Sequence, residues 1–177
     1  MDIRLIVLSI ILVAVSGRLH KRLCPMSRYL SVATSDITTL KQLQHDHEKN
    51  MSTNAMRCYR RMLRHKPSVC DLTQRDRLIL TLERVSLTVD VLTNMSMSAQ
   101  PDTVKESLMV FLKLRDDLKV CRGSPEYSEP TSPELKLWLH HLQRFKESAS
   151  PDCVQEAVIL SLIPLRVEDV TCWALNQ

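Results

Sequence analysis

The spacing of apolar residues predicts a series of helices, and the last of them carries the most apolar surface. Pro151 stands where a first-turn proline is tolerated, and Ser150 before it is a candidate N-cap. The residues that follow are apolar around most of a helical circumference, which is typical of a helix that is buried or that touches partners on two sides. We therefore expect the central helix of a bundle here, kinked near its middle by Pro164. Its apolar residues are Val154, Ala157, Val158, Ile159, Leu160, Leu162, Ile163, Leu165 and Val167.

Two helical regions are predicted in the first half of the chain from apolar residues three or four positions apart. Ser35 caps the first, which can continue or restart over residues 55–63 before Pro67 ends it. Thr73 and Asp76 resemble a capping box, with Asp in place of the usual Glu, and open the second. The inward positions are Ile37, Leu40, Leu43, His47 and Met51 in the first helix, and Leu78, Leu82, Val85, Val89 and Leu92 in the second.

Two more helices are predicted between these and the last one. The first is opened by Pro101 and stopped by Gly123, and the second runs from Pro133 to Phe145. Residues 122–133 between them are rich in Pro, Ser and Glu, which is typical of a linker. The inward positions are Val104, Leu108, Phe111, Leu112 and Leu118, then Leu135, Trp138, Leu139, Leu142 and Phe145.

Composition indicates an all-α fold, because strands joined by tight turns need glycines and an alternating apolar pattern. The only glycines are Gly17 and Gly123, and no sustained alternation occurs. Aromatic residues make up 4% of the chain, so the core must be built from Leu, Ile, Val and Met. The long stretch between the first two helices favours an overhand crossover, and hence an up-up-down-down bundle of five to six helices. A plain up-and-down bundle with short turns is the alternative.

The first residues have the three parts of a secretory signal. Arg4 is followed by the apolar run Leu5–Val15 and then by small residues, with Ala14 and Ser16 placed for a cut after Ser16; a cut after Gly17 is nearly as good. The alternative is a membrane anchor, but the run is much shorter than the roughly 20 residues that a span needs. We expect residues 1–16 to be a signal peptide, residues 17–177 to be one domain, and the protein to be secreted.

All six cysteines lie beyond the predicted signal, and their even number in an exported chain indicates disulfides. Spacing alone leaves their pairing open. They show no Cys-x-x-Cys pair, and His45 and His47 would point to different faces of a helix, so neither zinc nor another metal is expected. The sequence has no nucleophile elbow, phosphate loop or metalloprotease motif. We therefore expect a protein that is not an enzyme and needs no cofactor.

A basic cluster precedes the second helix: Arg57, Arg60, Arg61, Arg64, His65 and Lys66. It can be a solvated face, a contact for a receptor or for heparan sulfate, or a nucleic-acid site, and export argues against the last. Asn50-Met51-Ser52 and Asn94-Met95-Ser96 are N-glycosylation sequons, so Asn50 and Asn94 are candidate glycan sites.

The last third of the chain resembles a known family. The run Leu135–Gln143, then Glu147-Ser148-Ala149, Cys153 and an apolar last helix is similar to the interferon lambda sequences. Segments 87–92 and 118–121 also resemble the middle helices of that family. The likeness spans about 75–173, whereas 18–71 matches mainly in cysteine position and helix order. The chain thus resembles a type III interferon, or the related type IV (upsilon) interferons, among the class II helical cytokines.

The resemblance implies a disulfide scheme. Cys24 would pair with Cys121, and Cys58 would pair with Cys153. The family pattern does not dictate the remaining pair, Cys70 and Cys172. In the bundle that the resemblance implies, both lie at the same pole, which makes their pairing reasonable.

The resemblance also implies a function and two partners. Such a cytokine joins a ligand-specific class II receptor chain to the shared interleukin-10 receptor beta chain, which triggers JAK–STAT signalling and an antiviral state. The ligand-specific chain would contact the first helix, the crossover and the last helix. The candidate receptor-binding residues are Arg57, Arg60, Arg64, Leu160, Ile163 and Arg166. The alternative is a secreted, disulfide-stapled helical carrier or structural protein without signalling activity.

Overall fold

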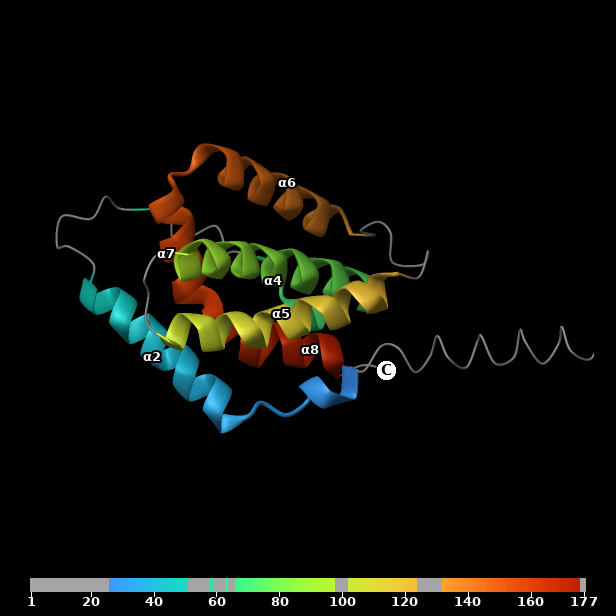
Figure 1. Ribbon diagram of the computed structural model, residues 1–177. Coiled ribbons are helices and arrows are strands. Elements are labelled where there is room, and N and C mark those ends of the chain that lie inside the picture. The colour runs from blue at the N-terminus through green and yellow to red at the C-terminus, as the bar shows by residue number, and fades with distance from the viewer. Residues whose placement is uncertain are drawn as a thin grey trace, which may run out of the picture.

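The fold is described from a computed structural model, which covers residues 26–50, 58, 63, 66–97, 102–123 and 132–175. Every element within these ranges is helical (Figure 1). They are η1 (Met26–Tyr29), α2 (Thr34–Asn50), η2 (Val69–Asp71), α4 (Gln74–Met97), α5 (Asp102–Arg122), α6 (Pro133–Ser148), α7 (Pro151–Pro164), η4 (Leu165–Asp169) and α8 (Val170–Ala174).

The helices form the up-up-down-down bundle that the sequence predicts. Figure 1 shows α2 and α4 running in one direction, and α5 and the final segment α7–α8 running back. Helix α6 runs with α2 and α4 but lies on the far side of α4 and α5 from α2 (Figure 1). The all-α fold and the long crossover between α2 and α4 are thus confirmed.

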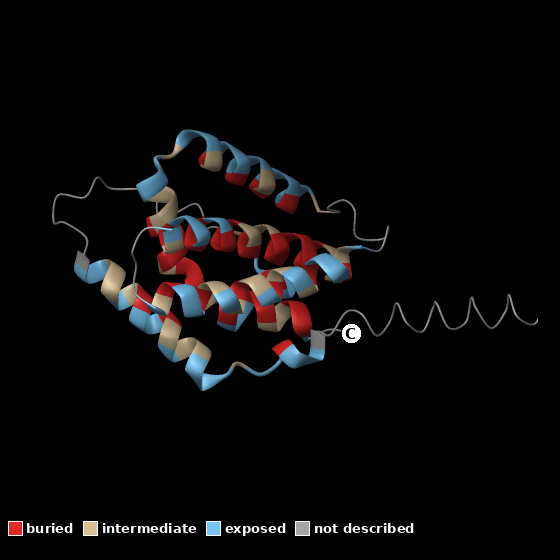
Figure 2. Cartoon of the chain, viewed as in Figure 1, coloured by how far each residue is buried: buried red, intermediate tan, exposed pale blue. Residues whose placement is uncertain are grey.

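Helix α4 is the central helix, and the expectation that the final helix takes this place is wrong. It contacts α5, α6, α7 and α8, as well as the short helices η2 and η4. The stripe predicted along it is buried, and so are Ile79, Leu80, Leu87 and Val91 on its other sides. The sequence did not indicate that α4 is buried on several sides, because polar residues lie between its apolar ones. Several of these polar residues are buried too (Figure 2). The final segment is also largely buried, but α7 packs mainly between α2 and α4.

Helix α5 packs along α4 with a face close to the predicted one. Val104, Phe111 and Leu118 are buried as expected, and Leu114 joins them, whereas Leu108 and Leu112 are only partly buried. Gly123 follows the last helical residue, and its N–H donates to the carbonyl groups of Lys119 and Val120. No described glycine has a positive φ, so Gly123 stops the helix without the left-handed cap that glycine often supplies.

Helices α6 and α7 begin in the same way, with a serine cap followed by proline. Ser132 Oγ accepts the N–H of Leu135 at 3.2 Å, and Ser150 Oγ accepts the N–H of Cys153 at 3.3 Å. The caps satisfy N–H groups that a helix leaves without an intrahelical partner. The predicted start of the last helix is confirmed, whereas α6 extends beyond Phe145 to Ser148.

Pro164 interrupts the last helix. Helix α7 ends at Pro164, a π-helical turn follows over η4, and α8 completes the segment. Proline has no N–H to donate to the preceding turn, and here the helix continues beyond this break through a single wider turn. The segment changes direction here, so that α7 and α8 point along different axes (Figure 1).

Two disulfides join the crossover region to the final segment. Cys58 is bonded to Cys153 at the start of α7, and Cys70 is bonded to Cys172 in α8. These are two of the pairs considered in the sequence analysis. Cys121 is also disulfide-bonded; its expected partner, Cys24, lies outside the described residues.

The buried carboxylate of Asp76 links the start of α4 to the start of α6. Asp76 has no exposed surface, and its Oδ2 accepts the backbone N–H of Ser132 at 2.8 Å. The Asp76 backbone N–H is in turn bonded to Thr73 Oγ1 at 3.3 Å, as a capping box requires. A residue of the α4 cap therefore also holds the N-cap residue of α6.

We expect Asp76→Ala to lower the free energy of unfolding by about 1–3 kcal/mol, because it leaves the buried N–H of Ser132 without this acceptor. Chemical denaturation measures the loss, and hydrogen exchange should show faster exchange at the start of α6. The control is Asp90→Ala, which removes the same charge from an exposed position of the same helix. Equal effects of the two substitutions would contradict this role of Asp76.

Candidate receptor-binding surface

The final segment keeps an accessible apolar stripe on its outer side. Leu160 and Ile163 are half-buried, and Val167 in η4 is 40% exposed. These residues follow one another at intervals of three and four positions, so they share one side of the segment. Of the three, the sequence analysis selected Leu160 and Ile163 and missed Val167. The sequence pattern marks Val167 as apolar but does not show which apolar residues of the last helix stay exposed.

Helix α2 borders this stripe. Gln44 of α2 donates its side-chain N–H to the carbonyl oxygen of Ile159 in α7 at 2.8 Å. Leu40 and Leu43 of α2 are buried against the core. The first and last helices are thus in direct contact, as the family resemblance requires for a shared face.

Arg166 is a buried side chain and not an exposed receptor contact, which corrects its place among the candidates. Its residue is 5% exposed. The guanidinium Nη2 lies 3.3 Å from Asp36 Oδ2 of α2, and its carbon lies 6.0 Å from the centre of the Tyr29 ring. Arg166 therefore fastens the final segment to α2 and to η1. Arg166 stands four positions after the buried Leu162, which places it on the inner side of the segment.

Tyr29 extends this set of contacts to α5 and α8. Its hydroxyl donates to Asp117 Oδ2 of α5, and its ring centre lies 5.8 Å from that of Trp173 in α8. Burial, and then the hydrogen bond to the Asp117 carboxylate, raise the pKa of Tyr29 above its usual value. The phenol thus stays protonated and continues to donate at neutral pH.

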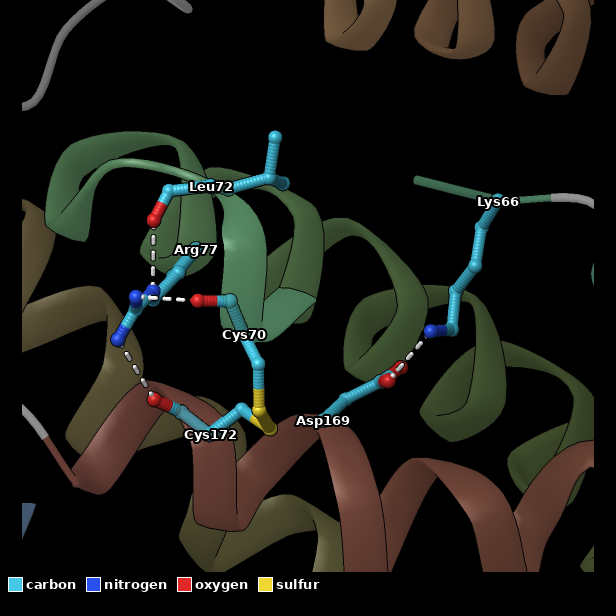
Figure 3. Close-up of a disulfide and its surroundings, with 6 residues drawn as sticks. All are labelled: Lys66, Cys70, Leu72, Arg77, Asp169 and Cys172. Atoms are coloured by element: carbon cyan, nitrogen blue, oxygen red, sulfur yellow. Dashed lines mark hydrogen bonds and ion pairs between the residues drawn. A yellow bond between two sulfur atoms is a disulfide. The ribbon is translucent and has the colours of Figure 1, made fainter. Parts of the chain in front are cut away.

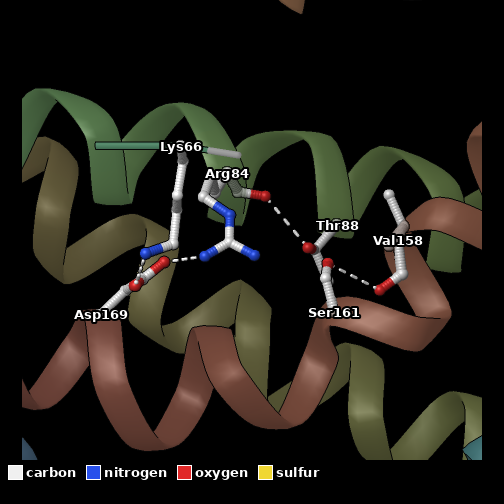
Figure 4. A network of polar contacts seen from close by, with 6 residues as sticks. All are labelled: Lys66, Arg84, Thr88, Val158, Ser161 and Asp169. Carbon is white, nitrogen blue, oxygen red and sulfur yellow. Dashed lines mark hydrogen bonds and ion pairs between the residues drawn. The ribbon is translucent and has the colours of Figure 1, made fainter. Parts of the chain in front are cut away.

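A buried carboxylate of the same segment, Asp169 in η4, lies between two cations (Figure 4). It pairs with Arg84 of α4 and, through Oδ1, with Lys66 Nζ at 2.7 Å. The Asp169 carboxylate and the nearby charge of Glu168 offset the burial of these two cations only in part. Burial lowers the pKa of Lys66 to about 8, with Arg84 adding repulsion, and burial lowers the pKa of Arg84 to about 10. Both cations remain charged at neutral pH.

Arg77 reinforces the nearby Cys70–Cys172 disulfide (Figure 3). Its Nε donates to the carbonyl of Leu72 at 2.7 Å, and its two terminal nitrogens donate to the carbonyls of Cys70 at 2.5 Å and Cys172 at 3.2 Å. A single guanidinium thus bonds to the backbone of both disulfide residues. Together with Asp169, it fixes the end of the crossover against the final segment.

The structure describes only part of the stretch that carries the basic cluster. Arg57, Arg60 and Arg64 lie outside the described residues, so their receptor role stays a prediction. Within the same stretch, Cys58 is bonded to Cys153, and Leu63 is 3% exposed in the core. Lys66, counted with the cluster in the sequence, belongs to the buried network and not to a solvated face.

The other candidates take part in no shared site. Asn94 is exposed near the end of α4, and the side chain of Asn50 lies outside the described residues. His47 is half-buried, and burial lowers its pKa. The described part of the chain contains no group of three or more residues placed to hold a metal ion.

Comparison with known proteins decides the family. A sequence model of the interleukin-28A family matches residues 21–176. The chain belongs to the interferon lambda family. It is accordingly an antiviral helical cytokine and not an enzyme.

Individual interferon lambda sequences are similar over most of their length. Interferon lambda-3 of Gallus gallus is 25% identical over 157 residues, covering 89% of this chain and 84% of the relative. Interferon lambda-3 and lambda-2 of Mus musculus are 24% and 25% identical over 153 residues, each covering 85% of this chain and 79% of the relative. Interferon lambda cytokines are secreted. None of the helices within the described ranges combines the length and apolarity needed to cross a membrane.

We expect Asp169→Ala to lower the free energy of unfolding by about 3–5 kcal/mol, because Arg84 and Lys66 would keep their charges without the buried counterion. Thermal and chemical denaturation measure this. Asp90→Ala is the matched control, since it removes the same charge from an exposed position of α4.

A second variant distinguishes the effect of leaving the two cations unpaired from the effect of changing buried side chains. Replacing Lys66 and Arg84 by Met and Asp169 by Leu removes all three charges, and we expect it to be much less destabilised than Asp169→Ala. A triple variant as unstable as the single one would contradict the account of the network as a charge balance.

Proposed function

We propose that this interferon lambda family member acts by joining two receptor chains at a cell surface. These are a ligand-specific class II cytokine receptor chain and the shared interleukin-10 receptor beta chain. Binding one chain holds the ligand at the membrane, so the second chain meets it at a high effective concentration. Kinases bound to the receptor tails then start JAK–STAT signalling. The observation that carries this proposal is the family match over residues 21–176.

The surface for the ligand-specific chain is the stripe of Leu160, Ile163 and Val167, with α2 beside it. Accessible apolar residues on an otherwise packed segment are suited to anchor a partner. The rigid attachment of this segment through Asp169, Arg166 and two disulfides supports the role, because a preorganised surface loses little entropy on binding. Arg57, Arg60 and Arg64 remain candidates for charged contacts at the rim of this surface.

We also propose that residues 1–16 are the export signal and residues 17–177 the mature chain. The family match begins at residue 21, beyond this signal, which supports the division. The exposed side chain of Asn94 supports its use as a glycan acceptor. A glycan there would lie on α4 and not on the stripe of the final segment.

We expect the purified mature chain to induce antiviral transcripts in cells that carry both receptors. Cells without the shared interleukin-10 receptor beta chain should lose the response, and restoring that chain should return it. Phosphorylated STAT and transcript levels are the measurements. A full response in the knockout cells would overturn the proposed receptor pair.

We expect Leu160→Ala to weaken binding to the ligand-specific chain by at least roughly tenfold, with little change in melting temperature. Ile163→Ala should lower both affinity and stability, because Ile163 also packs against the core. Surface plasmon resonance with the receptor ectodomain measures the affinities. Leu137→Ala is the control, since Leu137 is 57% exposed on α6, away from this face. A large loss of stability in Leu160→Ala would show that Leu160 belongs to the core, and equal affinity of Leu160→Ala and Leu137→Ala would place the receptor surface elsewhere.

A further inference from the structure

A groove lies on the side of the bundle formed by α4, the end of α5 and α6. Its first hollow, of about 290 Å³, lies between α4 and the end of α5. Its second, of about 230 Å³, lies between α4, Arg122 and α6. Glu83 and Arg122 line both hollows, so the two lie next to each other.

The charged residues that line this groove are mainly basic. Lys119 and Arg122 come from α5 and Lys146 from α6, and Glu83 is the one acidic residue among the lining residues. Arg122 Nη1 lies 3.6 Å from Glu83 Oε1, and Lys146 Nζ lies 4.0 Å from Glu83 Oε2. Both distances exceed those of good hydrogen bonds, and loose ion pairs of exposed side chains contribute little energy. The cations can therefore turn to an external anion at small cost.

The groove carries charged side chains above a floor that is partly apolar. The side chains of Arg122, Lys146 and Glu83 are 38%, 29% and 32% exposed. The apolar floor is nearly closed, with Ile79 and Leu82 2% and 3% exposed. A flexible polyanion would meet several cations along one line.

We propose that this groove binds a sulfated polysaccharide of the heparan sulfate type. Arg122, at the junction of the two hollows, contacts sulfate groups through its planar set of N–H donors, and Lys119 and Lys146 contact neighbouring sulfates on either side. Bound sulfates replace Glu83 as the partner of Arg122 and Lys146. The site is separate from the basic cluster of Arg57, Arg60 and Arg64, for which the sequence also allowed heparan sulfate.

The position of the groove leaves the proposed receptor surface free. Helices α6 and α2 lie on opposite sides of α4 and α5 (Figure 1), and no residue of α2 or of the final segment lines either hollow. The polysaccharide would thus hold the cytokine at a cell surface while α2 and the final segment stay open. This consequence rests on the proposed function, whereas binding itself does not.

The test uses the full mature chain and heparin as the probe. Replacing Lys119, Arg122 and Lys146 together by Gln should weaken heparin binding at least tenfold and lower the salt concentration of elution from a heparin column. In the matched control, the exposed residues Lys105, Lys113 and Lys136 are replaced by Gln, which removes the same total charge. It should change binding only slightly. Glu83→Gln should strengthen binding, because it removes the competing carboxylate, and this variant remains informative if the groove triple variant fails to fold.

Four results would overturn the proposal, and the first three concern the variants. They are equal losses in the groove and control triple variants, a loss confined to a variant with Arg57, Arg60 and Arg64 replaced by Gln, and unchanged binding in Glu83→Gln. Desulfated heparin should not bind, and if it binds as well as heparin the sulfate contacts are wrong. STAT phosphorylation in cells lacking heparan sulfate should be the same for the groove variant and the parent at saturating dose. Failure of the receptor experiment would leave these binding results unchanged.

Discussion

A single carboxylate, Asp169, holds separate parts of the bundle together. It lies at the end of the π turn and pairs with Arg84 in the middle of α4 and with Lys66 at the end of the crossover. All three groups are largely withdrawn from water, so none of the charges can be left alone without a large desolvation cost. The central helix, the crossover and the final segment must therefore reach their positions together.

Covalent and polar links surround this network and act on the same two chain segments. The Cys70–Cys172 disulfide and the Arg77 guanidinium join the same pair of backbones, and Cys58–Cys153 joins the crossover to the other end of the final segment. Arg166 then ties that segment to α2. The result is a rigid scaffold with its stripe of accessible apolar residues on the outside, and a preorganised surface loses little entropy when it binds a partner.

Much of the fold could be predicted because it is recorded in local signals. Serine caps, first-turn prolines and apolar spacing placed the helices to within a few residues, as Ser150 and Pro151 show. The central role of α4 could not be predicted, because buried Arg84 and Asp76 look like surface residues in a periodic pattern. Their partners, Asp169 and Ser132, lie far away in the sequence, and no local rule connects them. The burial of Arg166 was missed for a related reason, since its partners Asp36 and Tyr29 also lie far away in the sequence.

The π turn after Pro164 also bears on how this chain can change in length. Buried residues of the final segment come in adjacent pairs that recur every four positions: Ser161 and Leu162, then Leu165 and Arg166, then Asp169 and Val170. A regular α-helix turns by about 100° per residue, so a strict four-residue repeat would drift steadily out of the core without one wider turn. Deleting one residue here would rotate everything after it by about the same angle, carrying Cys172 away from Cys70. Insertions and deletions that are harmless in the linker before α6 would thus be selected against within the π turn, Leu165–Asp169. We expect descendants of this sequence to keep the wide turn even where their side chains differ.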